Sequence, residues 1–308
     1  MNLCQTCVIF VLLPGQSSGA IMQNAYRKED DIQLNLFFLL ALGFLFVFAW
    51  VLQSEYYFNA DVSWLVMASR RLLKGGSYTE DFFELNPPLI LYLYLPAVKL
   101  TQWFALSVPL AVRLYVFCLA ALSLSLSMMS LQKIFPVSEK AAIRVMVLIL
   151  TGLLLIFPLS GFSQREHFML LLTLPYFFLL AARLESGRPC REWVAVVVGG
   201  LAAIGFCIKP YYLLVFGMVE GVAFCSRPTF RQLIRPETVT IGLIAVLYPL
   251  IIYLRHPDYL QTVLPLVTAN YYANVKTPLR LFLKNQNLVI PCYAAIFYCL
   301  MVSRTRCR

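Results

Sequence analysis

Residues 34–52 form an uncharged, largely apolar run of transmembrane length, preceded by Arg27 and Lys28. A helix needs roughly 20 apolar residues to cross a bilayer. Further apolar runs lie at 108–131, 143–159, 168–184, 193–208, 211–225, 238–254 and 288–302. Because lipid offers no partner to backbone groups, such runs must form helices. We therefore predict an all-α, polytopic membrane protein with about eight transmembrane helices.

The composition agrees with this prediction. Hydrophobic residues make up 60% of the 308 residues and charged residues 13%, whereas soluble domains carry about 25% charged residues. The formal net charge of +10 would suggest a nucleic-acid ligand in a soluble protein. Here most Lys and Arg residues lie in short segments beside apolar runs, as is usual in membrane proteins. We therefore expect no nucleic-acid partner.

The segment 89–106 has two interpretations. It is apolar, but it contains Pro96, Lys99 and Gln102. It could cross the membrane, or lie on its surface as an amphipathic helix. The choice fixes the topology of every later helix.

The basic residues favour the surface interpretation, because cytoplasmic loops carry an excess of Lys and Arg. With 89–106 on the surface, the loops 132–142, 185–192 and 226–237 share one side, and each carries three basic residues with its flanks. The short loops on the opposite side carry only Arg165 and Lys209. The resulting prediction is a cytoplasmic segment 1–33, a transmembrane domain 34–302 with external loops 53–107 and 255–287, and a basic cytoplasmic tail 303–308.

The first external loop carries the densest set of charged residues. They are Glu55, Asp61, Arg70, Arg71, Lys74, Glu80, Asp81 and Glu84. Asp61 precedes apolar residues at helical spacing, Gly75–Gly76 would end that helix, and Pro87–Pro88 would begin another. On position alone Asp61 is an N-cap. The basic residues could anchor lipid headgroups, and the tyrosines could form an interfacial belt.

The order of residues in this region resembles the GT-C superfamily of membrane glycosyltransferases, which includes protein O-mannosyltransferases and lipid A aminoarabinose transferases. The resemblance covers roughly residues 34–215. The matching residues are Asp61, Ala68–Gly75, Tyr78, Asp81, Asn86–Leu89 and Arg113, followed by Glu166 within Gly161–His167 and by Lys209 before Pro210. Such enzymes have a catalytic acidic residue after the first span and membrane-parallel helices in the first external loop.

The resemblance implies an inverting glycosyltransferase in the inner (plasma) membrane, with its active face external. Its donor would be a polyprenyl-phosphate-linked sugar, its acceptor a glycan, lipid or protein of the cell envelope, and its surroundings membrane lipids. Transfer requires a carboxylate to orient or deprotonate the acceptor hydroxyl. The leaving phosphate needs a cation or a metal ion.

Candidate residues for these tasks follow from the resemblance and from their external position. Asp61 and Glu166 are the catalytic candidates, and together they could bind Mg or Mn through oxygen. The phosphate-binding candidates are Arg165, His167, Lys209, Arg255 and His256. The candidates for the acceptor loop are Tyr78, Asp81, Glu84 and Asn86.

Each assignment has a structural alternative. Glu166 could form an ion pair with Arg165 or Lys209 that fixes the loop, and His167 could be an orienting histidine. Lys209, Arg255 and His256 could contact lipid headgroups. Glu220 lies within an apolar run, where an ionisable residue invites a functional interpretation, but towards the cytoplasmic half and so outside the sugar site.

The sequence also departs from the family. Val62 follows Asp61 where many relatives have a second acidic residue, and Glu166 stands where several have Asp. The chain ends near the eighth span at Cys307–Arg308, whereas relatives usually have more spans, so one expectation is a truncated, inactive fragment. The other rival is a transporter or flippase for lipid-linked intermediates. It predicts charged residues facing each other near mid-membrane.

Overall fold

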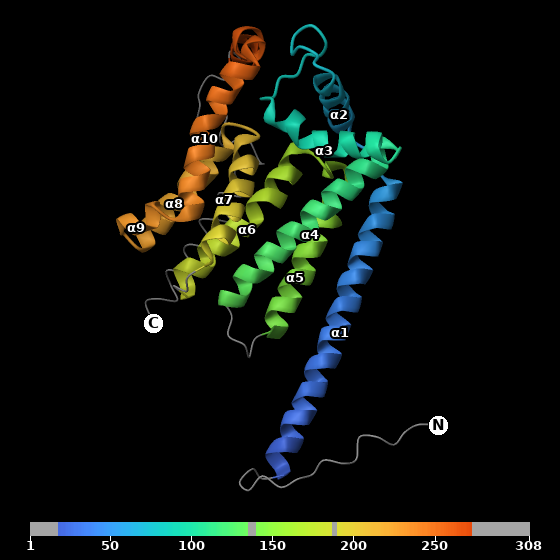
Figure 1. Cartoon of the computed structure of the whole chain (residues 1–308), viewed down its shortest axis with the longest axis vertical. Helices are drawn as coiled ribbons and strands as arrows, with labels where there is room; N and C mark the ends of the chain where they lie inside the picture. Colours follow the sequence, from blue (N-terminus) through green and yellow to red (C-terminus); the bar gives the residue numbers. More distant parts are fainter. Residues whose placement is uncertain (1–17, 135–139, 187–189, 273–308) are drawn as a thin grey trace. The chain divides into compact units, whose positions relative to one another are not determined.

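The computed structural model describes residues 18–134, 140–186 and 190–272, and all structural statements concern these residues. They form helices joined by short connections, with no strand among them (Figure 1). The predicted all-α class is therefore confirmed for the described part. The predicted span 288–302, the tail 303–308 and residues 273–287 of the second external loop lie outside it.

The apolar runs of the sequence form the long helices. Within the described residues, four helical segments are long and apolar enough to cross a membrane. They are Gln33–Glu55 of α1 (Ser18–Glu55), α4 (Val108–Ile134), Arg165–Glu185 of α6 (Arg165–Ser186) and α10 (Pro236–Arg255). Three helices are shorter, namely α5 (Lys140–Leu155), α7 (Glu192–Cys207) and α8 (Tyr212–Ser226). Most exposed side chains of α10 are large and apolar, as suits contact with lipid; they include Val239, Leu243, Val246, Leu250 and Leu254.

The chain divides into two compact units, one ending at Leu45 within α1 and the other starting at Phe46. The second unit contains the last turns of α1 and all later helices.

Helix α6 lies between α4 and α7, and α7 in turn packs against α10 (Figure 1). Glycines permit the close approach of α7 to both neighbours. A Cβ on Gly205 would lie 2.8 Å from Cγ2 of Thr173 in α6, and one on Gly199 would lie 2.7 Å from the carbonyl oxygen of Glu237 in α10. Small residues commonly serve this purpose in membrane helix bundles.

Two helices follow α1 and precede α4 in the sequence, namely α2 (Ala60–Leu73) and α3 (Leu89–Trp103). They pack against each other, and α3 also packs against α4, where it crosses one end of the bundle (Figure 1). We call this end, at which Asp61 lies, the Asp61 end. The buried side chains of α3 are those of Ile90, Leu91, Leu93, Tyr94, Ala97 and Val98.

Capping explains the limits of α2, and it corrects one interpretation of Asp61. Asn59 is the N-cap, and its side-chain oxygen accepts a hydrogen bond from the Asp61 N–H at 3.0 Å. The Asp61 carboxylate is therefore not the helix cap. The helix ends at Leu73, and Gly75 has a φ of +85°, the left-handed conformation common after a helix.

The remaining elements are short. They are η2 (Leu159–Gly161), α9 (Phe230–Leu233), α11 (Leu264–Val267) and two π-helical turns, η3 (Tyr259–Val263) and η4 (Thr268–Tyr272). The π-helical turns follow α10 at the Asp61 end of the bundle. Such turns frequently lie near functional sites.

Candidate functional site

The first feature of the Asp61 end is an ion pair between two distant parts of the chain. Nη2 of Arg165, the first residue of α6, donates to Oδ2 of Asp61 at 2.8 Å. The Asp61 side chain is 57% exposed, whereas that of Arg165 is 15% exposed. The guanidinium therefore orients a carboxylate that remains accessible to a solute.

A second ion pair lies at the next residue of α6. Nζ of Lys209 donates to Oε1 of Glu166 at 2.7 Å, and the Tyr212 hydroxyl donates to the same oxygen at 3.3 Å. The Lys209 ammonium lies 5.6 Å and 5.8 Å from the ring centroids of Tyr211 and Tyr212. Lys209 is therefore held by both a carboxylate and two aromatic rings.

The loop before α6 holds both pairs in place. Ser163 has a φ of +61°, which is uncommon for a residue with a side chain. Its carbonyl accepts from the buried Tyr94 hydroxyl, and its N–H donates to Nδ1 of His167 at 2.9 Å. Since Nε2 of His167 lies 2.8 Å from the Leu154 carbonyl, this nitrogen must donate.

His167 therefore takes the structural alternative. It is buried and both of its ring nitrogens are used within the loop. The expectation that it binds phosphate does not fit these bonds, because neither ring nitrogen is left to donate to a ligand.

Arg113, which matched the family pattern, fixes the segment leading to Asp61. Its Nη2 donates to the carbonyls of Ser54 at 3.3 Å and Tyr56 at 3.2 Å, and its guanidinium lies 5.4 Å from the Phe58 ring centroid. The residues between α1 and α2 are therefore tied to α4. This contact determines where Asn59 and Asp61 begin α2.

The four residues predicted to contact the acceptor stabilise the loop between α2 and α3. Glu84 is buried and accepts hydrogen bonds from Nε1 of Trp64 at 2.8 Å and from the backbone N–H of Asn86 at 2.9 Å. The Tyr78 hydroxyl donates to the Asn86 carbonyl, and the Asp81 carboxylate accepts from a backbone N–H at 2.7 Å. These four residues scaffold the connection between α2 and α3, and none of these bonds involves Asp61 or Glu166.

His256 joins this loop to the end of α10. Its Nε2 lies 2.8 Å from the Tyr92 hydroxyl, and Oδ2 of Asp258 accepts from the Tyr78 N–H at 2.7 Å. Burial lowers the pKa of His256 below its ordinary value of 6.5, although Asp258 opposes this effect. Arg255 is exposed at the last residue of α10. Among the described contacts, none joins His256 or Arg255 to the Asp61 and Glu166 pairs.

A metal ion at Asp61 and Glu166 stays a prediction. Each carboxylate is paired with a cationic side chain. In the ranges that the structure describes, no three His, Cys, Asp or Glu side chains gather as metal ligands. Magnesium can be held by one or two carboxylates with substrate phosphates, so an ion there would share these oxygens with Arg165 and Lys209.

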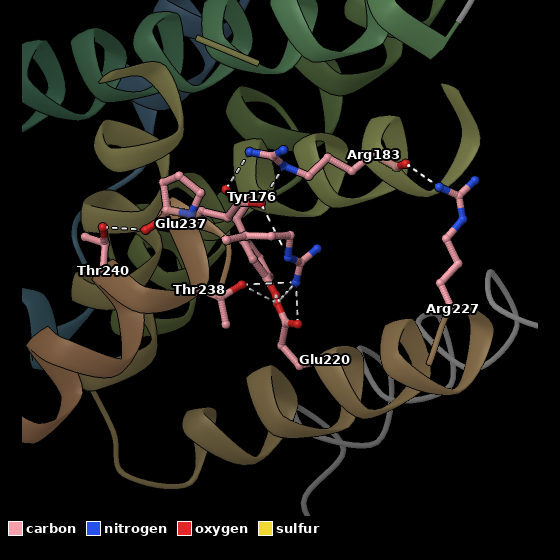
Figure 2. A network of polar contacts seen from close by, with 9 residues as sticks. Tyr176, Arg183, Glu220, Arg227, Glu237, Thr238 and Thr240 are labelled. Atoms are coloured by element: carbon pink, nitrogen blue, oxygen red, sulfur yellow. Dashed lines mark hydrogen bonds and ion pairs between the residues drawn. The ribbon is translucent and has the colours of Figure 1, made fainter. Parts of the chain in front are cut away.

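A second cluster of charged residues lies at the opposite end of the bundle, and it was not predicted from the sequence. We call this end the Glu220 end (Figure 2). Two arginines that look like ordinary loop cations, Arg183 and Arg235, are paired with Glu237 and Glu220. Glu237 has no exposed surface, and Glu220 and Arg235 are each 6% exposed. The only signal in the sequence was the presence of Glu220 in an apolar run.

No protein-family model, curated protein or solved structure matches the chain. The two sites are therefore interpreted from their chemistry.

Proposed function

We propose that this protein is a membrane glycosyltransferase, which moves a sugar from a polyprenyl-phosphate-linked donor to an acceptor hydroxyl of the cell envelope. The observation that carries the proposal is the meeting of two ion pairs at consecutive residues of α6. Asp61 reaches Arg165 from the first turn of α2, and Lys209 reaches Glu166 from the turn between α7 and α8. Three separate chain segments therefore bring two carboxylates and two cations together.

The exposed carboxylate suits the role of general base. In the proposed step the acceptor oxygen bonds to the anomeric carbon while the bond from that carbon to the phosphate oxygen breaks. Asp61 takes the acceptor proton, and the polyprenyl phosphate leaves with the bonding electrons. The 57% exposure of Asp61 supports this role, because an acceptor could reach the carboxylate.

The two cations suit the developing charge on the phosphate. Arg165 and Lys209 are each 15% exposed, so solvent screens them less than surface cations. Positive groups fixed before the reaction stabilise a leaving anion without reorganisation. In this scheme Glu166 positions Lys209, and the Tyr212 hydroxyl donates a further hydrogen bond to the Glu166 carboxylate.

The proposal includes a topology of eight spans in the plasma membrane, with the Asp61 end outside and α2 and α3 on the membrane surface. Basic residues at the other end support it, namely Lys133, Lys140, Arg144, Arg191, Arg227 and Arg231. Trp103 and Phe104 at the end of α3 are exposed and suit an interface. A membrane-impermeant thiol reagent applied to intact cells should label a Tyr57→Cys variant but not a Phe230→Cys variant; the reverse pattern would refute this orientation.

The activity can be tested in vesicles that contain the purified chain. The probes are radiolabelled polyprenyl-phosphate sugars offered with envelope acceptors, and the variant is Asp61→Asn, which keeps the shape and removes the base. Glu80→Gln is the matched control, because Glu80 is an exposed carboxylate in the same loop. We expect transfer by the wild type and the control but not by Asp61→Asn. Equal transfer by all three would refute the assignment of Asp61.

The buried charges at the Glu220 end favour a second candidate, a flippase for lipid-linked intermediates. Paired ionisable residues inside a membrane bundle are common along transport pathways. These pairs balance in charge, however, and of their four residues only Glu220 lies near the middle of a helix. Arg183 is in the last turn of α6, and Arg235 and Glu237 are at the start of α10. Movement of a fluorescent polyprenyl-phosphate sugar across vesicles, without transfer, would favour this candidate over the enzyme.

A further inference from the structure

Polar contacts join α6 to α8 and to the residues that flank α8, at three levels along α6. They involve Glu166 with Lys209 and Tyr212, Tyr176 with Glu220, and the Leu184 carbonyl with Arg227. The partners are separated by 43 to 46 residues at every level. The two helices therefore run in the same direction in one fixed register, with the candidate active site at the first level.

The middle level is buried and its carboxylate is well satisfied (Figure 2). Oε1 of Glu220 accepts from the Tyr176 hydroxyl at 2.5 Å, from Nη2 of Arg235 at 2.5 Å and from the Thr238 hydroxyl at 3.2 Å. Arg235 also contacts the other oxygen of Glu220. The pair therefore links α6 and α8 to the start of α10.

Arg235 has a fixed position of its own. Its Nε lies 3.7 Å from Glu237, which is held in turn by two contacts from Arg183 at 2.6 Å and 2.8 Å. The backbone of Glu237 lies against Gly199 of α7. The partner of Glu220 is thus anchored to the bundle independently of α8.

Glu220 can find these partners in only one register. It is the one charged residue between Tyr212 and Ser226. A slip of α8 by one turn along α6 would bring Glu220 towards Leu172 or Leu180, both buried and apolar. A buried carboxylate without a partner is strongly disfavoured. Apolar side chains alone discriminate poorly between registers, and a single buried polar pair can specify one.

We propose that the Glu220–Arg235 pair is a register pin, which fixes α8 along α6 and so holds Lys209 and Tyr212 against Glu166. Tyr212 lies eight residues before Glu220, about 12 Å along the helix. A slip of one turn, about 5.4 Å, would carry Lys209 out of reach of Glu166. Glu220 and Arg235 are then positioning residues; their effect on transfer rests on the proposed function, but their effect on register does not.

The register can be measured by electron paramagnetic resonance between two spin labels. The labels would be attached at Leu170→Cys in α6 and Leu214→Cys in α8, both exposed positions, after replacement of the nine native cysteines. The test variant is Glu220→Leu with Arg235→Leu, which removes the pin without leaving a buried charge. Glu192→Leu is the control, because Glu192 is exposed in the first turn of α7.

The pin predicts one narrow distance in the wild type and the control, and a broadened distance or one shifted by about 5 Å in the double variant. A native, narrow distance in the double variant would overturn the proposal. If that variant does not fold, Glu220→Gln gives the same reading, since it keeps the shape and removes the charge. Loss of folding in both would also overturn the proposal, because the pair would then be a requirement of folding rather than of register.

A transfer assay adds an independent readout. The double variant should raise the KM for the donor about tenfold while kcat changes less, because the base at Asp61 is untouched. An unchanged KM together with a shifted label distance would overturn the link from register to the donor site. Absence of transfer in the wild type would refute the proposed enzyme and leave the distance measurement as the test of the pin.

Discussion

Asp61 of α2 and Arg165 of α6 are 104 residues apart in sequence, yet they are joined by a 2.8 Å hydrogen bond between their charged groups. The Tyr94 hydroxyl supports the loop that precedes Arg165, and Arg113 supports the segment that precedes Asp61. Both members of the pair are therefore held by the bundle. Groups fixed in this way lose little entropy when a substrate binds.

Replacement of Lys209 should weaken donor binding. Lys209→Gln removes the cation beside Glu166, and we expect the KM for a polyprenyl-phosphate sugar to rise about tenfold, or about 1.4 kcal/mol. Lys209→Arg should retain most of the affinity. Lys99→Gln, at an exposed lysine of α3, is the control. A KM that stays constant in Lys209→Gln would argue against a phosphate contact.

The adjacent glycines of α7 should respond differently to alanine. A Cβ at Gly199 would lie 2.7 Å and 2.8 Å from backbone atoms of Glu237, whereas a Cβ at Gly200 meets nothing within 4 Å. Gly199→Ala should lower the free energy of unfolding by about 1–3 kcal/mol through overpacking. Gly200→Ala should be neutral or raise it by up to about 1 kcal/mol. Unfolding in detergent measures both, and equal effects would contradict the close contact between α7 and α10.

The helices could be predicted from the sequence because apolar runs of membrane length have no other stable conformation. Gly75 after α2 and Pro88 before α3 also lie where the sequence placed the helix limits. The sequence alone did not decide whether Glu166 pairs with Arg165 or with Lys209. Consecutive residues of a helix point about 100° apart, so Arg165 turns towards Asp61 and leaves Glu166 to Lys209.

The cluster at the Glu220 end was missed for a different reason. Arg183 and Arg235 lie beside loops, where basic residues usually contact lipid headgroups or solvent. Their pairing with Glu237 and Glu220 depends on how closely α10 approaches α7 and α6, which is set by Gly199 and Glu237. Such tertiary contacts leave no periodic pattern in a single sequence.

The backbone at Ser163 should tolerate glycine with a gain in stability. Its φ of +61° costs a residue with a Cβ roughly 1–2 kcal/mol, and its buried hydroxyl has no hydrogen-bond partner among the described residues. Ser163→Gly should therefore raise the free energy of unfolding by about 1 kcal/mol. Ser160→Gly in the neighbouring 3-10 turn should bring no gain. A loss of stability in Ser163→Gly would contradict the left-handed conformation.

The burial of His256 should make stability depend on pH. Since burial lowers the pKa of His256, the unfolded chain binds its proton first, near the ordinary value of 6.5. Stability should then fall as the pH drops below about 6.5, and level off below the folded pKa. His256→Gln should remove this part of the pH dependence, while the steeper loss caused by carboxylate protonation at lower pH remains. An unchanged profile in His256→Gln would contradict the burial of this ring.

The central claim, that Asp61 is the base of a sugar transfer at the Asp61 end, is tested most directly by the single-turnover rate of Asp61→Asn. General-base catalysis contributes roughly 10²–10⁴-fold to a rate. We predict that the variant binds the donor with near-native affinity and transfers the sugar at least about 100-fold more slowly than the wild type. A rate within about twofold of the wild type would contradict the claim.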